Sequence, residues 1–289
     1  MPCSYIRDGL PHAEPTAVLG LALRTTDATR FADRIATCES WIAGLQRPDG
    51  SVPPNTQLDV PGWGTSWALI LKSQNSASPN SHKSVNVARA LEWLLATKGM
   101  QGDRSNATLH DVELVGWPWV TGTHTWLEPT CLAVMALQAQ GLADHPRRRE
   151  GLQVLQNRLL PRGGANYGNT IVLGQELLPH LQASGFVLQA LAGQADASGR
   201  IAKTRDYLKR ELGPATGATS LAFGLLGLLA WNDVPPDAGN WLQSSAKRVL
   251  RRDNSPYRLA ALALAAAKLT KRLESVGPKS SEIEMGAVR

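Results

Sequence analysis

A short sequence occurs twice in this chain of 289 residues, and each time it opens the same kind of segment pair. Glu14-Pro15-Thr16-Ala17 precedes Val-Leu-Gly-Leu-Ala-Leu, and Glu128-Pro129-Thr130-Cys131 precedes Leu-Ala-Val-Met-Ala-Leu. Each copy is followed by an amphipathic segment that ends in a Leu-Gln pair and a glycine turn. Repetition on this scale is typical of folds built by packing one supersecondary unit against copies of itself. The chain is therefore expected to form a repetitive, single-unit fold.

The repeated segments have the spacing of helices. Apolar positions recur with helical periodicity along the chain, and runs of alternating β-branched residues are nearly absent, which predicts an all-α fold. Gly, Pro and Asn residues separate the segments. The expected helices cover residues 15–25, 30–45, 64–73, 84–97, 129–141, 147–159, 180–193, 200–211, 217–231, 238–251 and 256–273.

The two helices of each pair differ in composition. One is rich in Ala, Leu and Gly with few charges, and its partner carries Arg, Lys and Glu beside an apolar stripe. A helix that is apolar all round must be buried, whereas an amphipathic helix can face water. This asymmetry predicts inner and outer layers that close into an (α/α) toroid of five to six helix pairs, formed by residues 1–273. Residues 274–289 lack periodicity and are expected to be a disordered tail.

A second motif falls in phase with the helix pairs. It consists of Trp41-Ile42, Gln46 and Gly50-Ser51-Val52, and it resembles the repeated Gln-Trp element of squalene-hopene and oxidosqualene cyclases, with Val52 in the place of the final Trp. The segment 163–168, with Tyr167 in the aromatic place, resembles a later turn of that repeat. Weaker copies start at Trp93-Leu94 and Trp241-Leu242.

This resemblance extends over roughly residues 10–270, and it implies the α/α toroid of terpene cyclases and protein prenyltransferase β subunits. In that superfamily the Gln and Trp side chains tie one outer helix to the next turn, which is a structural task.

The resemblance also implies a position for an acid. Class II cyclases protonate an alkene with the middle Asp of an Asp-x-Asp-Asp-Thr-Ala element at the start of an inner helix. When Thr130 is laid on the Thr of that element, Glu128 takes the middle position, and Trp126 and Pro129 replace the flanking aspartates. Glu128 and His124 are therefore the candidate catalytic acid–base residues.

Aromatic side chains cluster in sequence around Glu128. The faces of such rings stabilise cations and suit a polyprenyl chain. The candidate substrate-binding residues are Trp63, Trp67, Trp117, Trp119, Trp126 and Tyr167.

A structural interpretation of the same residues stays open. An acidic residue before Pro and Thr is a good helix start, with Pro at the first helical position and the carboxylate near the positive helix end. Glu14 repeats this arrangement, and a catalytic acid is needed only once. The tryptophans would then pack the repeat.

Motifs for metals and cofactors are not evident in the sequence. Protein prenyltransferases bind zinc through an Asp-x-Cys pair and a later His, but Pro129 stands two residues before Cys131. Asp233 and Asp237 have the wrong spacing for an aspartate-rich magnesium motif. The three cysteines are odd in number and lack metal-ligand spacing. We therefore expect no metal, no cofactor and a reducing compartment.

The net charge is +6, and the basic residues fall in short groups at the polar faces of expected helices. This pattern predicts solvated faces and no nucleic-acid partner, with a weak attraction to anionic lipid head groups as its best functional use. The N-terminus lacks a signal-peptide profile, and the longest apolar stretch, 221–231, is short of the roughly 20 residues that cross a bilayer. We expect a cytoplasmic protein with peripheral membrane contact.

Two functions follow from these observations. The leading hypothesis is a cyclase-like or prenyltransferase-like enzyme that acts on an apolar isoprenoid, with acid–base chemistry at Glu128. The alternative is a non-catalytic toroid that binds a lipid, a peptide or a partner subunit, because full triterpene cyclases pair two helical domains and this chain is long enough for one.

Overall fold

The computed structural model describes residues 2–58, 60–73, 84–102 and 110–276. In this part of the chain, eleven helices and one two-stranded hairpin form. The elements are α1 (Ala13–Asp27), α2 (Ala32–Leu45), α3 (Gly64–Leu71), α4 (Val87–Ala96), α5 (Leu127–Ala139), α6 (Pro146–Asn157), β1 (Ile171–Val172), β2 (Gln175–Glu176), α7 (Leu181–Ala190), α8 (Arg200–Glu211), α9 (Ala218–Leu229), α10 (Ala238–Arg252) and α11 (Pro256–Val276).

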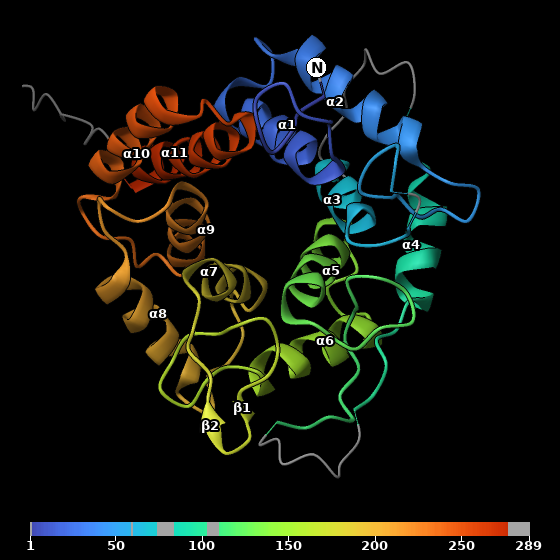
Figure 1. Cartoon of the computed structure of the whole chain (residues 1–289), viewed down its shortest axis with the longest axis vertical. Helices are drawn as coiled ribbons and strands as arrows, with labels where there is room; N and C mark the ends of the chain where they lie inside the picture. Colours follow the sequence, from blue (N-terminus) through green and yellow to red (C-terminus); the bar gives the residue numbers. More distant parts are fainter. Residues whose placement is uncertain (1, 59, 74–83, 103–109, 277–289) are drawn as a thin grey trace, which may run out of the picture.

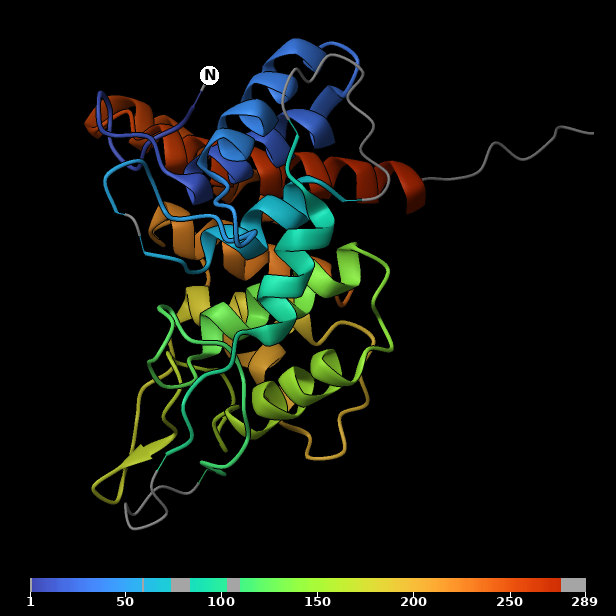
Figure 2. The same ribbon diagram turned by 90° about the vertical axis from the view of Figure 1, so that its right-hand side faces the viewer.

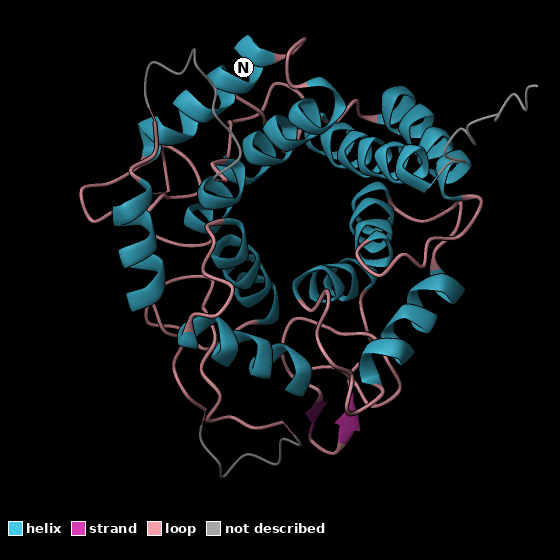
Figure 3. Ribbon diagram, turned by 180° about the vertical axis from the view of Figure 1, so that it is seen from behind, coloured by secondary structure: helices cyan, strands magenta, loops and turns pink. Residues whose placement is uncertain are grey.

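The odd-numbered helices form a closed inner ring. Each packs against the next, from α1 through α3, α5, α7 and α9 to α11, and α11 packs back against α1 (Figure 1). The even-numbered helices α2, α4, α6, α8 and α10 form an outer layer around that ring (Figure 3). Seen from the side, the hairpin of β1 and β2 projects from one edge of the molecule (Figure 2). The all-α toroid expected from the sequence is confirmed, with six inner and five outer helices among the described residues.

Composition assigns each helix to its layer. The inner helix α9 carries no charged residue, and nine of its twelve residues are buried. The outer helix α10 buries Leu242, Ser245 and Val249 along one stripe and turns its lysine and arginines to solvent. An inner helix meets neighbours on nearly every side, whereas an outer helix can bury only one face.

Small residues set the closest approach within the inner ring. A Cβ atom added to Gly185 of α7 would lie 2.2 Å from the Phe223 carbonyl oxygen of α9, and one added to Gly227 would lie 2.7 Å from the Gly185 oxygen. The backbones of α7 and α9 therefore touch here, and only hydrogen fits between them.

A hydroxyl near the start of each of four inner helices holds the loop that precedes it. The hydroxyl oxygen of Thr16, Thr65 or Thr130 accepts a hydrogen bond from the backbone N–H of the residue thirteen positions earlier, and Ser184 accepts one from Ala165. The distances between these nitrogen and oxygen atoms are 2.9–3.0 Å. The repeat therefore fixes its loops by the same contact each time.

The Gln residues of the repeat connect successive outer helices. The side chain of Gln46, after α2, donates to the carbonyl oxygens of Gly50 and Asn86 and accepts from the Asn86 N–H, which precedes α4. Gln156 of α6 likewise donates to Ala195, ahead of α8. Gly50 has a φ of +91°, and a Cβ atom there would lie 2.2 Å from the Arg89 carbonyl oxygen. Gly163, with a φ of +96°, meets α8 in the same way.

Most helix ends lie within three residues of the expected ones without coinciding with them, and only α8 matches its expected range at both ends. Helices α1 and α5 begin two residues before Pro15 and Pro129, because every N–H in the first turn lacks an intrahelical acceptor and proline is tolerated there. The hairpin at 171–176 was not expected; it turns through two residues with positive φ, Leu173 and Gly174. Helix α11 continues to Val276, and the rest of the expected tail lies outside the described residues.

Candidate functional site

Corresponding positions of three inner helices meet at one mouth of the ring. Glu14, Glu128 and Tyr257 are each the second residue of their helix, α1, α5 and α11, and Trp63 directly precedes α3. Helices α1 and α5 are separated by α3 in the ring, so groups on them that interact do so across the interior. This mouth brings together two carboxyl groups, two tyrosines and two tryptophans.

Glu14 is buried and held by three donors. The hydroxyls of Tyr257 and Tyr5 donate to Oε1 at 2.6 Å and to Oε2 at 2.9 Å, and the indole N–H of Trp63 donates to Oε2 at 3.1 Å. Burial raises the pKa of the Glu14 carboxyl, and the three donors act against that rise by stabilising its anion. Of the two carboxyl groups in this mouth, Glu14 is therefore the one whose anion is stabilised by hydrogen-bond donors of the protein, which replace water.

Glu128 has the opposite environment. It is 6% exposed, and it has no hydrogen-bond or ion-pair partner among the described residues. Burial raises the pKa of its carboxyl to about 8, and the charge of Glu14 pushes in the same direction. Glu128 is therefore mainly protonated at neutral pH, the state required of a proton donor.

Neither carboxylate caps its own helix. The residues that cap α1 and α5 are His12 and Trp126, and neither makes a side-chain capping bond. Pro15 and Pro129 stand at the third helical position instead of the first. The duplication that favoured a capping interpretation has another consequence in the folded ring: it places two acids of unequal environment in one mouth.

His124 is not joined to Glu128. Its side chain is exposed, and its backbone forms a bridge with Met100. Among the described residues, no hydrogen bond or ion pair connects His124 with Glu128, although the two are four residues apart in sequence. The turn at 121–124 precedes α5, so helical spacing does not apply to this pair.

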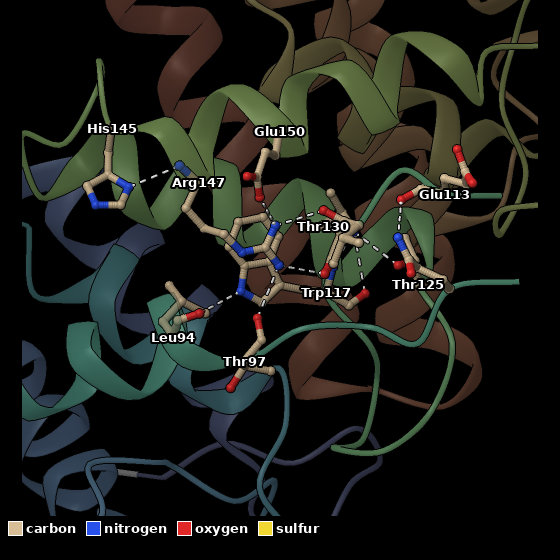
Figure 4. A network of polar contacts seen from close by, with 12 residues as sticks. Leu94, Thr97, Glu113, Trp117, Thr125, Thr130, His145, Arg147 and Glu150 are labelled. Atoms are coloured by element: carbon tan, nitrogen blue, oxygen red, sulfur yellow. Dashed lines mark hydrogen bonds and ion pairs between the residues drawn. The ribbon is translucent and has the colours of Figure 1, made fainter. Parts of the chain in front are cut away.

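Trp117 lies in a polar network between the layers, shown in Figure 4. Its indole N–H donates to the Leu94 carbonyl oxygen of α4 at 2.8 Å, and the guanidinium of Arg147 lies 3.8 Å from the ring centroid. Arg147, buried on α6, also donates to the carbonyl oxygens of Thr97, Val115 and Gly116. Trp117 therefore ties α4 and α6 to the start of α5.

The other candidate aromatics fall into three places. Trp119 packs edge-on against Trp63 with ring centroids 5.0 Å apart, which puts it beside the donors of Glu14. Trp126 and Tyr167 are 39% and 50% exposed, and the ring of Tyr167 contacts that of His180 in a tilted arrangement, with centroids 4.8 Å apart. Trp67 of α3 lies deeper, in a buried row with two phenylalanines.

That row crosses the interior of the ring. The centroids of Trp67 and Phe186 are 6.4 Å apart, and those of Phe186 and Phe223 are 4.4 Å apart. Helices α3 and α7 lie on opposite sides of α5, so Trp67 and Phe186 meet on the inner face. The buried indole N–H of Trp67 has no hydrogen-bond partner among the described residues.

Sequence reasoning missed Tyr5 and Tyr257 as site residues and treated Glu14 as a helix start. The repeated Glu-Pro-Thr element was the available signal for Glu14. Tyr5 and Tyr257 carry no comparable signal, because they come from the two ends of the chain and meet at 5.0 Å only when the ring closes.

One comparison with known proteins bears on this geometry. The apo structure of the type II terpene cyclase MstE from Scytonema matches with a TM-score of 0.57 at 16% sequence identity, over 90% of this chain and 88% of that one. This chain has a terpene cyclase-like toroid fold. No protein-family model matches the sequence, and no curated protein matches it either.

Two further observations describe this terpene cyclase-like toroid. Within the described ranges, no group of three or more His, Cys, Asp or Glu side chains is placed to hold a metal ion. None of the described helices is both long and apolar enough to cross a bilayer.

Proposed function

We propose that this toroid is an isoprenoid cyclase-like enzyme in which Glu128 donates a proton to an alkene. The observation that carries this proposal is the buried Glu128 carboxyl, which lacks a hydrogen-bond partner among the described residues and has a pKa of about 8. Two acids whose environments differ in this way are a usual arrangement for acid–base chemistry.

In the proposed step, the proton leaves the Glu128 carboxyl and adds to one alkene carbon. The π electron pair forms the new C–H bond, the other alkene carbon becomes a cation, and Glu128 becomes a carboxylate. The ring faces of Trp63 and Trp119 near this mouth are suited to a cation. Glu14 stays fixed by Tyr5 and Tyr257, and its negative charge favours the protonated form of Glu128 before reaction.

Chain length does not argue against this function. The alignment covers 88% of the chain of the type II terpene cyclase MstE, so one toroid of about this size is compatible with that activity. Isoprenoids are the substrate class that the resemblance implies, and the apolar inner helices suit such a chain.

A second function, a non-catalytic toroid that binds a lipid, a peptide or a partner subunit, has an observation in its favour. The row of Trp67, Phe186 and Phe223 fills part of the interior with buried rings in mutual contact. A protein that only holds a ligand at a mouth needs no deep chamber.

One experiment separates the two functions. The wild type, Glu128→Gln and the control Glu92→Gln, an exposed residue of α4, are incubated with C10 to C30 isoprenoids and their diphosphates, and mass spectrometry measures products and retained lipid. We expect cyclised product from the wild type and the control and at least about a hundredfold less from Glu128→Gln, because an amide has no acidic proton. Product formation should also fall above about pH 8, as Glu128 ionises.

Retained lipid without product would support the binding function. Equal turnover by wild type and Glu128→Gln would contradict the role of Glu128. The absence of both product and retained lipid with every isoprenoid tested would contradict the proposed enzyme.

A further inference from the structure

A hollow lies toward the opposite end of the ring from the two glutamates. It has a volume of about 390 Å³ and is lined by residues of the second halves of α5, α7, α9 and α11, including Met135, Gln189 and Leu226. Lys268 of α11 also lines it, and it follows Tyr257 by eleven residues, which is about 16 Å along the helix. This hollow is therefore separate from the mouth that holds Glu128.

Three cations face this hollow from one helix. Lys268, Lys271 and Arg272 stand at positions i, i+3 and i+4 of α11 and line the same space. None of them has an ion-pair partner among the described residues. The hollow thus holds a concentrated positive charge, and no described acidic side chain forms an ion pair with it.

An apolar groove continues from the hollow. It has a volume of about 330 Å³, and its lining includes Val234, Pro235, Leu269 and Leu273. The groove shares Leu229 and Arg272 with the hollow, so the two spaces meet beside a cation. Leu273 is 64% exposed, which leaves this apolar surface open to solvent.

We propose that these two spaces form a binding site for a soluble, single-chain anionic amphiphile, whose phosphate or carboxylate head is bound by Lys268, Lys271 and Arg272 and whose apolar chain lies in the groove. Unpaired cations in a concave site bind an anion strongly, and an adjoining apolar groove adds affinity for a chain attached to it. The proposal does not rest on the function of Glu128, because it concerns the other end of the ring and is tested by binding alone.

The test is calorimetric titration of the full chain with decyl phosphate below its micelle concentration. Inorganic phosphate and decyltrimethylammonium are titrated as separate arms, and phosphatidic acid vesicles serve as a fourth arm. Binding of decyl phosphate is compared in the wild type, in Lys268→Gln/Lys271→Gln/Arg272→Gln, and in Arg34→Gln/Arg149→Gln/Arg251→Gln. The second triple variant removes the same charge from exposed arginines elsewhere. Circular dichroism and thermal unfolding check the fold of both.

We expect saturable binding of decyl phosphate that weakens about tenfold or more in the first triple variant and less than twofold in the second. Inorganic phosphate should bind at least about tenfold more weakly than decyl phosphate, and decyltrimethylammonium should not bind. Replacing Leu273 with Asn should weaken decyl phosphate without changing the affinity for inorganic phosphate.

Three results would overturn the proposal. The first is equal affinity for decyl phosphate in the wild type and the first triple variant. The three cations would then serve only to stabilise the negative C-terminal ends of nearby helices. The second is equal affinity for inorganic and decyl phosphate. The third is binding to vesicles alone, which would make this end a membrane surface instead of an amphiphile site.

Discussion

Glu14 and Glu128 lie in the same local sequence and at the same helical position, yet their carboxyl groups differ in their hydrogen-bond partners. Three side chains donate to Glu14, and none among the described residues donates to Glu128. A carboxylate needs donors in place of the water that it loses on burial, so the group without them keeps its proton. At the residue scale, the tertiary neighbours of each carboxyl decide its chemistry.

This difference predicts how stability depends on pH. The pKa of Glu128 is about 8 in the folded protein, against an ordinary value of 4.5. Between these two pH values the folded state binds more protons than the unfolded state does. The wild type therefore loses stability as the pH rises from 4.5 to 8. Glu128→Gln lacks this loss. The free energy of unfolding of Glu128→Gln, relative to that of the wild type, should rise by on the order of 3 kcal/mol between pH 5 and pH 9, as measured by urea unfolding. Parallel pH profiles for the two proteins would contradict this result.

At the scale of elements, the ring depends on how closely neighbouring inner helices approach. Gly185 of α7 lies against the backbone of α9, whereas Gly44, near the end of the outer helix α2, has nothing within 4 Å of an added Cβ atom. Both are helical glycines, and only their tertiary surroundings differ. They form a matched pair for testing the interface.

Gly185→Ala should lower the free energy of unfolding by about 3 kcal/mol, because its Cβ atom would lie 2.2 Å from the Phe223 oxygen and the two helices would have to separate. Gly44→Ala should raise it by about 0.5 kcal/mol, since alanine favours a helix over the unfolded chain. Both changes are measured by chemical denaturation. A similar effect of the two substitutions would show that α7 and α9 are not in such close contact.

At the scale of the whole molecule, closure joins the two ends of the chain. The Tyr257 hydroxyl bonds to Glu14 across 243 positions, and the Ser255 hydroxyl donates to the Tyr5 carbonyl oxygen at 2.6 Å across 250. Helices α1 and α11 bury their remaining apolar faces against each other at this seam. The last helix thus completes both the ring and the set of donors around Glu14.

Tyr257→Phe should therefore weaken the seam and the site together. Removing this charge-assisted bond should cost about 2 kcal/mol of stability and raise the pKa of Glu14. Amide hydrogen exchange should become faster in the first turns of α1 and α11 together. The control Tyr207→Phe, which loses a bond to the Pro179 carbonyl oxygen, should cost about 1 kcal/mol and leave the seam unchanged. Unchanged exchange in α1 after Tyr257→Phe would refute the coupling.

Much of the architecture is readable from local pattern. The Glu-Pro-Thr repeat, the contrast between charge-poor and amphipathic segments, and Gln46 with Gly50 predicted a two-layered toroid, because each reports an interaction within one repeat or with its neighbour. The aromatic candidates were harder to place. Trp117 and Trp119 are two residues apart, yet one binds between the layers and the other lies beside the mouth.

The sequence by itself determined the helices, their assignment to layers and the repetition that makes a ring, because periodicity and composition act over a few residues. Only the tertiary structure decided that Glu14 would be surrounded by donors from α11, the residue before α3 and the N-terminal segment, while Glu128 has none among the described residues. The physical reason is that desolvation and hydrogen bonding depend on which groups closure brings together, and those groups lie up to 243 positions apart in the chain.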